Sequence, residues 1–211
     1  MKTKAIFILI ALATIMQVRF AYGQETNFKD NKNFVNIAGK PVHQQFKSVD
    51  ICGPASVFSA KLSEKGFTPS QKNNNLMTGV FAGYEATAVY ETTPVTKNVY
   101  RVTASLPYRA TWTNVENDYK TFKENLTLKY GEPKNVIERF WEPYHPGDGY
   151  ELKALGSNKA NFNCEWITPG GQIIIKILGD ETKAYVQLIY TDSIGVDKFN
   201  KEKEDQFLED L

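Results

Sequence analysis

The chain has 211 residues, 42% of them hydrophobic and 13% aromatic, which is enough to bury the core of one ordinary domain or of two small repeats. Its 25 basic and 24 acidic residues give a net charge of +1, which argues against the basic surface of a nucleic-acid-binding protein. Two cysteines and two histidines without ligand spacing predict no zinc site, and no other metal or cofactor motif is present.

The first 23 residues predict a secretory signal peptide. Lys2 and Lys4 give it a positive start, residues 5–16 are apolar and uncharged, and Ala21 and Gly23 place small side chains at positions −3 and −1 of the expected cleavage site. The apolar run is shorter than the roughly 20 residues that span a bilayer, and no cysteine near the cut offers a lipid attachment site. The alternative is a buried helix or an amphipathic anchor. We expect an exported protein, periplasmic or secreted, with no membrane insertion after cleavage.

A polar lead-in follows at residues 24–45. Because the leader holds three basic residues and no acid, the mature chain would carry 22 basic and 24 acidic residues, a net charge of −2. This balance gives no reason to invoke nucleic acid or anionic lipid. The lead-in should be loosely ordered, and its apolar pieces, residues 34–37 and Phe46, could form an edge strand.

The first predicted helix begins near Pro54, which suits a first helical turn, and carries an apolar stripe of Val57, Phe58 and Leu62. Gly66 is the expected stop. Three strand-like runs follow, at residues 75–84, 85–92 and 98–106. The short turns between them predict an antiparallel meander.

The second predicted helix has the clearest pattern in the chain. Thr113 and Glu116 form a capping box, and Gly131 ends the helix. Its apolar residues recur at spacings of three or four: Val115, Tyr119, Phe122, Leu126 and Tyr130.

The remaining elements are a strand at 135–141, an irregular loop at 142–150, a short helical turn at 151–155, and strands at 160–168, 172–178 and 184–191. Residues 169–171 form a hairpin turn. The charged tail should be a solvated helix or disordered.

Turns too short for crossovers predict a two-layer α+β fold, with a mainly antiparallel sheet and helices on one face. The element order is tandem, αβββ-αββββ. We expect one domain over residues 46–192, with halves 46–107 and 108–192, followed by a charged tail at 193–211.

Several structural motifs together resemble a group of uncharacterised exported proteins of Bacteroidetes-type bacteria. They are Lys65-Gly66-Phe67, Gly79-Val80-Phe81-Ala82-Gly83-Tyr84, Lys129-Tyr130-Gly131-Glu132-Pro133, Ile189-Tyr190-Thr191-Asp192 and Glu209-Asp210-Leu211. The resemblance covers most of the mature chain and implies no activity and no catalytic residue. The tandem layout is similar to that of β-lactamase-inhibitor-like domains, a likeness of architecture that does not imply function.

Cys52 and Cys164 could form one disulfide in an oxidising compartment, or both could be buried thiols. Cys52 precedes a helix whose dipole could lower a thiol pKa, but a structural role is the simpler account. A serine nucleophile would need His43 or His145 as its base, and no nucleophile elbow is present. The residues therefore predict no catalytic site.

The segment Phe140-Trp141-Glu142-Pro143-Tyr144-His145-Pro146-Gly147-Asp148-Gly149-Tyr150 gathers aromatic side chains in a loop that prolines make rigid, which lowers the entropic cost of binding. We predict a ligand site at Trp141, Tyr144, His145 and Tyr150. The alternative is that Phe140 and Trp141 simply pack over the sheet.

Acidic residues also cluster near this loop, at Glu138, Glu142, Asp148 and Glu151. They could serve an envelope hydrolase of glycan or peptide. We expect instead a non-enzymatic domain that binds an envelope protein or a glycan, in part on the strand runs 84–90 and 186–190. A structural accessory protein is the third hypothesis.

Overall fold

The computed structural model describes residues 40–211. The predicted signal peptide, most of the lead-in and the predicted edge strand at residues 34–37 lie outside the described residues. The first half contains β1 (Gln45–Phe46), β2 (Val49–Asp50), α2 (Ala55–Glu64), β3 (Phe67–Pro69), β4 (Leu76–Phe81), β5 (Tyr84–Thr92) and β6 (Val99–Ser105). The second half contains α3 (Trp112–Tyr130), β7 (Asn135–Phe140), α4 (Glu151–Gly156), β8 (Ala160–Thr168), β9 (Gly171–Gly179), β10 (Ala184–Asp192) and α5 (Ser193–Glu209).

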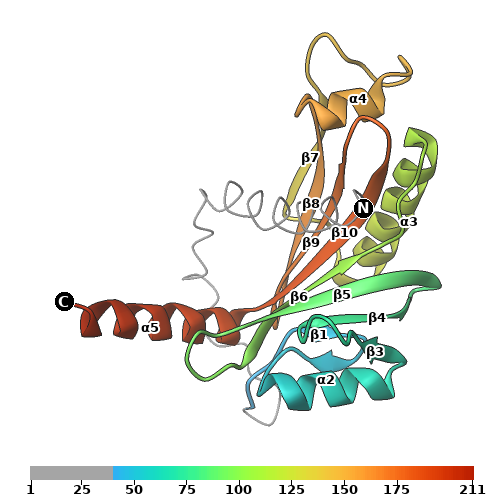
Figure 1. Ribbon diagram of the computed structural model, residues 1–211. Coiled ribbons are helices and arrows are strands. Elements are labelled where there is room, and N and C mark those ends of the chain that lie inside the picture. The colour runs from blue at the N-terminus through green and yellow to red at the C-terminus, as the bar shows by residue number, and fades with distance from the viewer. Residues whose placement is uncertain (1–39) are drawn as a thin grey trace, which may run out of the picture. The chain divides into compact units, whose positions relative to one another are not determined.

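Eight of these strands form one antiparallel sheet in the order β3-β4-β5-β6-β10-β9-β8-β7, and β1 and β2 form a separate hairpin (Figure 1). The fold is α+β with a mainly antiparallel sheet, as predicted. The first half has one strand more than expected, β3, so that each half is a helix followed by four strands. The order is symmetric because β6 and β10, the last strands of the two halves, pair at the centre of the sheet.

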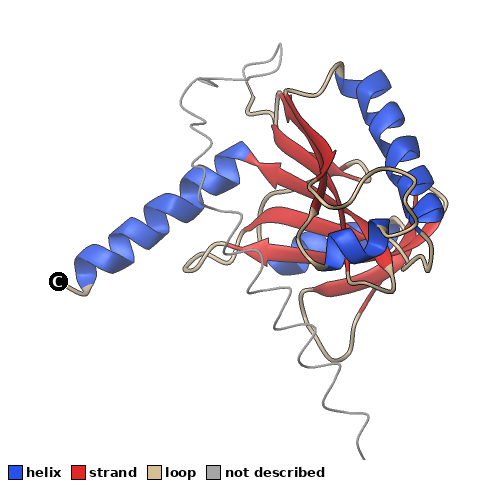
Figure 2. Cartoon of the chain, turned by 90° about the horizontal axis from the view of Figure 1, so that it is seen from above, coloured by secondary structure: helices blue, strands red, loops and turns tan. Residues whose placement is uncertain are grey.

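Helices α2 and α3 cover one face of the sheet, which we call the inner face (Figures 1 and 2). Aromatic rings fill the layer between them and the strands. Phe81 of β4 stacks on Phe122 of α3 at 5.8 Å between ring centroids and on Phe46 of β1 at 5.0 Å. Phe46 also meets Tyr190 of β10 at 5.4 Å. One core therefore joins the hairpin, both halves of the sheet and α3.

The tyrosines of the strand runs 84–90 and 186–190, on which we expected part of the binding, take part in this packing. Tyr90 and Tyr190 are buried, at 4% and 6% exposure, and Tyr84 packs against Phe122 at 5.5 Å. All three face the helices. These three rings are therefore used for packing under the helices and not for an exposed aromatic surface.

Helix α3 begins two residues earlier than its sequence pattern predicts. Its N-cap is Thr111, which accepts a hydrogen bond from the Asn114 amide, and not Thr113. The reason is tertiary: Trp112 packs edge-on against Phe140 at 5.3 Å and Phe162 at 4.9 Å, and this contact fixes the first turn. The prediction of the Thr113 capping box was wrong.

The charged tail is the helix α5, one of the two predicted alternatives. Asp192 caps it by accepting from the Gly195 amide at 2.8 Å, and the Phe199 ring packs at a tilt against Tyr100 of β6, with 4.8 Å between ring centroids. Glu202 accepts from the amides of Val95 and Thr96 in the turn between β5 and β6. Beyond Glu202 every residue is exposed, and the helix projects from the sheet (Figures 1 and 2).

The end of the lead-in is held in place from residue 43 onward. The His43 ring nitrogen Nδ1 lies 3.1 Å from both carboxylate oxygens of Asp192, and the Gln44 amide donates to the same carboxylate at 2.8 Å. The expectation of loose order therefore does not hold for residues 43–45. Within residues 40–211, no helix has both the length and the apolar character needed to span a bilayer.

Candidate functional site

The aromatic loop that the sequence singled out runs from the end of β7 to the start of α4. Its shape is set by two carboxylates. Asp148 accepts hydrogen bonds from the amides of His145 at 2.9 Å and Tyr150 at 2.7 Å, and these bonds lower the pKa of Asp148. Glu151, which is buried, accepts from the Gly147 amide at 2.8 Å. Asp148 and Glu151 thus fold the loop back on itself.

The two ends of the aromatic set have different surroundings. Phe140 meets Phe162 at 5.2 Å and, partly buried, packs against the core over the sheet, as the alternative interpretation expected for it. Tyr144 is half-buried against the same core. Trp141 is half-buried at the surface, where the Arg139 guanidinium lies over its ring at 4.4 Å. A cation at this distance from an indole face is attracted to it, and this holds the ring in one orientation.

A surface hollow of about 600 Å³ opens beside Trp141 and Tyr144, between the start of the loop, α3 and β8. It combines aromatic walls with three glutamates and one arginine. Its lining residues are Glu116, Glu138, Arg139, Phe140, Trp141, Glu142, Tyr144, His145, Pro146 and Phe162. We call this the loop hollow.

Three of the four predicted ligand residues, Trp141, Tyr144 and His145, line the loop hollow. The fourth, Tyr150, is 60% exposed and lines a second hollow of about 440 Å³ at the end of the loop and the start of α4, together with Trp112 and Lys153. The structure therefore brings three of the candidates together and separates the fourth.

The glutamates of the loop hollow have unequal partners. Glu138 accepts from the Lys123 ammonium at 2.7 Å and from the Tyr119 hydroxyl at 2.9 Å. Burial opposes ionisation of Glu138, but these hydrogen bonds outweigh it and lower its pKa. Glu116 pairs with Lys120 at 3.1 Å. Glu142 is exposed and has no ion pair or hydrogen bond with any residue in the range 40–211.

No sequence pattern marked Glu116, Arg139 or Phe162 as members of a site. They come from the second turn of α3, from β7 and from β8, and only the pairing of β7 with β8 under α3 assembles them. Asp192, which holds the segment around His43, was missed as well. A carboxylate directly before the helix at Ser193 is an N-cap signal that could have found it.

The two cysteines do not form a disulfide: both are free thiols. Cys164 lies on the inner face of β8, where it contacts the Tyr119 hydroxyl at 3.1 Å. Burial raises the pKa of Cys164 to about 11. Cys52 lies between β2 and α2, in the first half of the chain, whereas Cys164 is in the second half. Burial also raises the pKa of Cys52. Neither thiol has the lowered pKa of a nucleophile.

No three or more histidine, cysteine, aspartate or glutamate side chains within residues 40–211 are grouped so that they could hold a metal ion. The resemblance to exported Bacteroidetes-type proteins stays a prediction. Comparison with protein-family models, with curated proteins and with solved structures found no match to this chain.

Proposed function

We propose that this chain is an exported binding protein that takes a segment of an envelope glycan in the loop hollow. The observation that carries the proposal is the hollow itself, in which Trp141 and Tyr144 stand beside three carboxylates and an arginine. Its volume, about 600 Å³, lies in the range of small-molecule sites. Aromatic faces suit the apolar faces of sugar rings, and carboxylates accept hydrogen bonds from hydroxyls.

Preorganisation supports binding over the alternatives. The loop is held by hydrogen bonds to Asp148 and Glu151, and Trp141 is fixed by Arg139, so little conformational entropy remains to be lost when a ligand binds. A surface without such a hollow would instead favour the structural accessory role.

The hydrolase alternative is less well supported by the same residues. A general acid needs a raised pKa, whereas the pKa of Glu138 is lowered by Lys123 and Tyr119. Asp148, one of the acids on which the hydrolase hypothesis rested, is occupied by backbone amides of the loop.

The test is a screen of defined envelope oligosaccharides against the purified protein, followed by calorimetry on the best binder. We expect one saturable site, and we expect Trp141→Ala to weaken binding about tenfold or more because a central aromatic contact is lost. Tyr150→Ala, in the second hollow, should leave the affinity unchanged.

Tyr108→Ala is the matched control, since Tyr108 is 50% exposed and packs on Tyr185 away from the loop hollow. Equal affinities of the wild type and the Trp141→Ala variant, with both folded by circular dichroism, would refute the site. New reducing ends in the bound oligosaccharide would favour the hydrolase, and no binder in the screen would favour the accessory role.

A further inference from the structure

The face of the sheet opposite α2 and α3, which we call the outer face, has a lysine near its middle. Lys176 lies in β9, where the register places Asn163 of β8 on one side of it and Gln187 of β10 on the other. Since neighbouring strands are about 4.8 Å apart, these two amide side chains flank the lysine stem. Gln187 reaches on to the Ser105 hydroxyl of β6 at 3.5 Å. Lys176 therefore stands in a row of uncharged polar side chains.

Lys176 is partly buried, yet its ammonium group has no carboxylate within ion-pair distance and no hydrogen-bond acceptor among residues 40–211. Burial, followed by the positive charge of Arg101, lowers the pKa of Lys176. A charge withdrawn from water without a partner costs free energy. The outer face thus carries a positive charge that no described residue neutralises.

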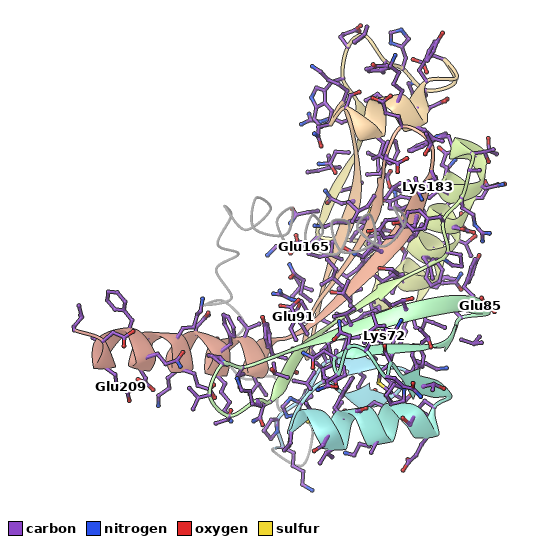
Figure 3. The ribbon with its side chains drawn as sticks, viewed as in Figure 1. Lys72, Glu85, Glu91, Glu165, Lys183 and Glu209 are labelled. Atoms are coloured by element: carbon purple, nitrogen blue, oxygen red, sulfur yellow. The ribbon has the colours of Figure 1, made fainter. Side chains whose placement is uncertain are left out.

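Two acids of the outer face, Glu165 and Glu91, already accept hydrogen bonds. Glu165 accepts from Gln172 and from Asn135, and Glu91 accepts from Tyr100 and pairs with Arg101 at 3.2 Å. Figure 3 shows Glu91 and Glu165 on the side of the sheet away from α3. Glu91 pairs with Arg101, and Glu165, which lies next to Ile174 in register, accepts from neutral amides only. Within residues 40–211 no carboxylate lies within ion-pair distance of Lys176, and a group with a single negative charge matches it.

An apolar patch lies beside Lys176. Ile174 precedes it by two residues on β9 and pairs in register with Ile189 of β10, and both isoleucines are partly exposed. Two residues along a strand span about 6.7 Å, which is also the distance between alternate side chains on one side of an extended peptide. The spacing of the lysine and the isoleucines therefore matches a strand-like ligand with a carboxylate and an apolar side chain at positions i and i+2.

We propose that the outer face binds an extended, acidic peptide segment of a partner protein, with its carboxylate on Lys176 and its apolar side chain on Ile174 and Ile189. This site is on the opposite face of the sheet from α3, and it does not depend on the glycan proposal. Asn163 and Gln187 would orient the carboxylate by donating amide hydrogens to it.

The test is a titration of the isotope-labelled protein with two peptides, acetyl-Thr-Glu-Thr-Val-Thr-amide and the same peptide with Gln in place of Glu, followed by NMR. We expect chemical-shift changes at β8, β9 and β10 around Lys176. The Gln peptide should bind about tenfold more weakly or worse, because the charge pair is lost. Lys176→Met should abolish the preference for Glu, and Lys183→Met, at an exposed lysine in the β9–β10 turn, should preserve it.

Thermal unfolding supplies a second readout that keeps the proposal falsifiable. Since the ammonium of Lys176 is unpaired, Lys176→Met should raise the Tm while it removes binding. Equal affinities for the two peptides, unchanged binding by Lys176→Met, a Tm lowered by that substitution, or shifts produced only by inorganic phosphate would each overturn the proposal.

Discussion

Phe46 offers the sharpest test of the core described above. It comes from a two-residue strand next to the polar lead-in, yet it is completely buried, and its ring meets Phe67 at 5.8 Å, Phe81 at 5.0 Å and Tyr190 at 5.4 Å. If the β1–β2 hairpin is an integral part of the core, the Phe46→Ala substitution should be among the most destabilising in the chain.

The magnitude follows from the contacts. Truncation of a buried phenylalanine to alanine costs about 3–5 kcal/mol, and the loss of three aromatic pairs, each worth about 0.5–1.5 kcal/mol beyond area burial, places Phe46 at the upper end. A domain of this size has a stability of about 5–15 kcal/mol, so the variant should fold with a Tm lower by about 10 °C or more.

The assay is urea unfolding of the wild type and of the Phe46→Ala and Phe46→Leu variants, followed by both fluorescence and circular dichroism. The Leu variant should lose far less stability because it keeps most of the buried volume. An unfolding free energy lowered by less than about 1 kcal/mol in Phe46→Ala would refute the reasoning, because a peripheral hairpin could then detach without cost to the sheet.

Three further predictions concern the hairpins and the C-terminal helix. Burial raises the pKa of Glu202, but hydrogen bonds from the Thr96 side chain and from the Val95 and Thr96 amides outweigh this and hold the pKa at about 2, below the usual 4.5. The contribution of the ionised Glu202 to the docking of α5 should therefore be complete above pH 4.5 and be lost as the pH falls toward 2. Hydrogen exchange of the α5 amides measures this, and Glu202→Gln should remove the pH dependence. Gly79→Ala should destabilise the protein by about 2 kcal/mol or more in urea unfolding, since its Cβ would come within 2.6 Å of the Gly66 carbonyl oxygen; an unchanged midpoint would show that β3 can move away. Ser48→Gly should stabilise the protein by about 0.5 kcal/mol in the same assay, because Ser48 has a φ of +62° in the β1–β2 turn and glycine adopts this conformation without strain. A loss of stability would mean that the backbone entropy that glycine loses on folding outweighs the strain removed.

The sequence alone determined the elements whose patterns are local. The stripe of Val115, Tyr119, Phe122 and Leu126 predicted the inner face of α3, and all four residues are buried there. The strand runs after each helix and the turn at residues 169–171 predicted an antiparallel sheet, because short connections leave no room for crossovers. The loop after β7 was also recognisable as a candidate site from its composition alone.

Only the tertiary structure decided which residues share a surface. The start of α3 at Trp112 depends on Phe140 and Phe162, and the membership of Glu116 and Arg139 in the loop hollow depends on how α3 lies over β7 and β8. The partly buried position of Lys176 between Asn163 and Gln187 exists only because β8, β9 and β10 pair in one register. The physical reason is the same in each case: periodicity reports the face of an element that is buried, whereas a binding site is made where several elements meet, and contacts between residues far apart in sequence leave no pattern along the chain.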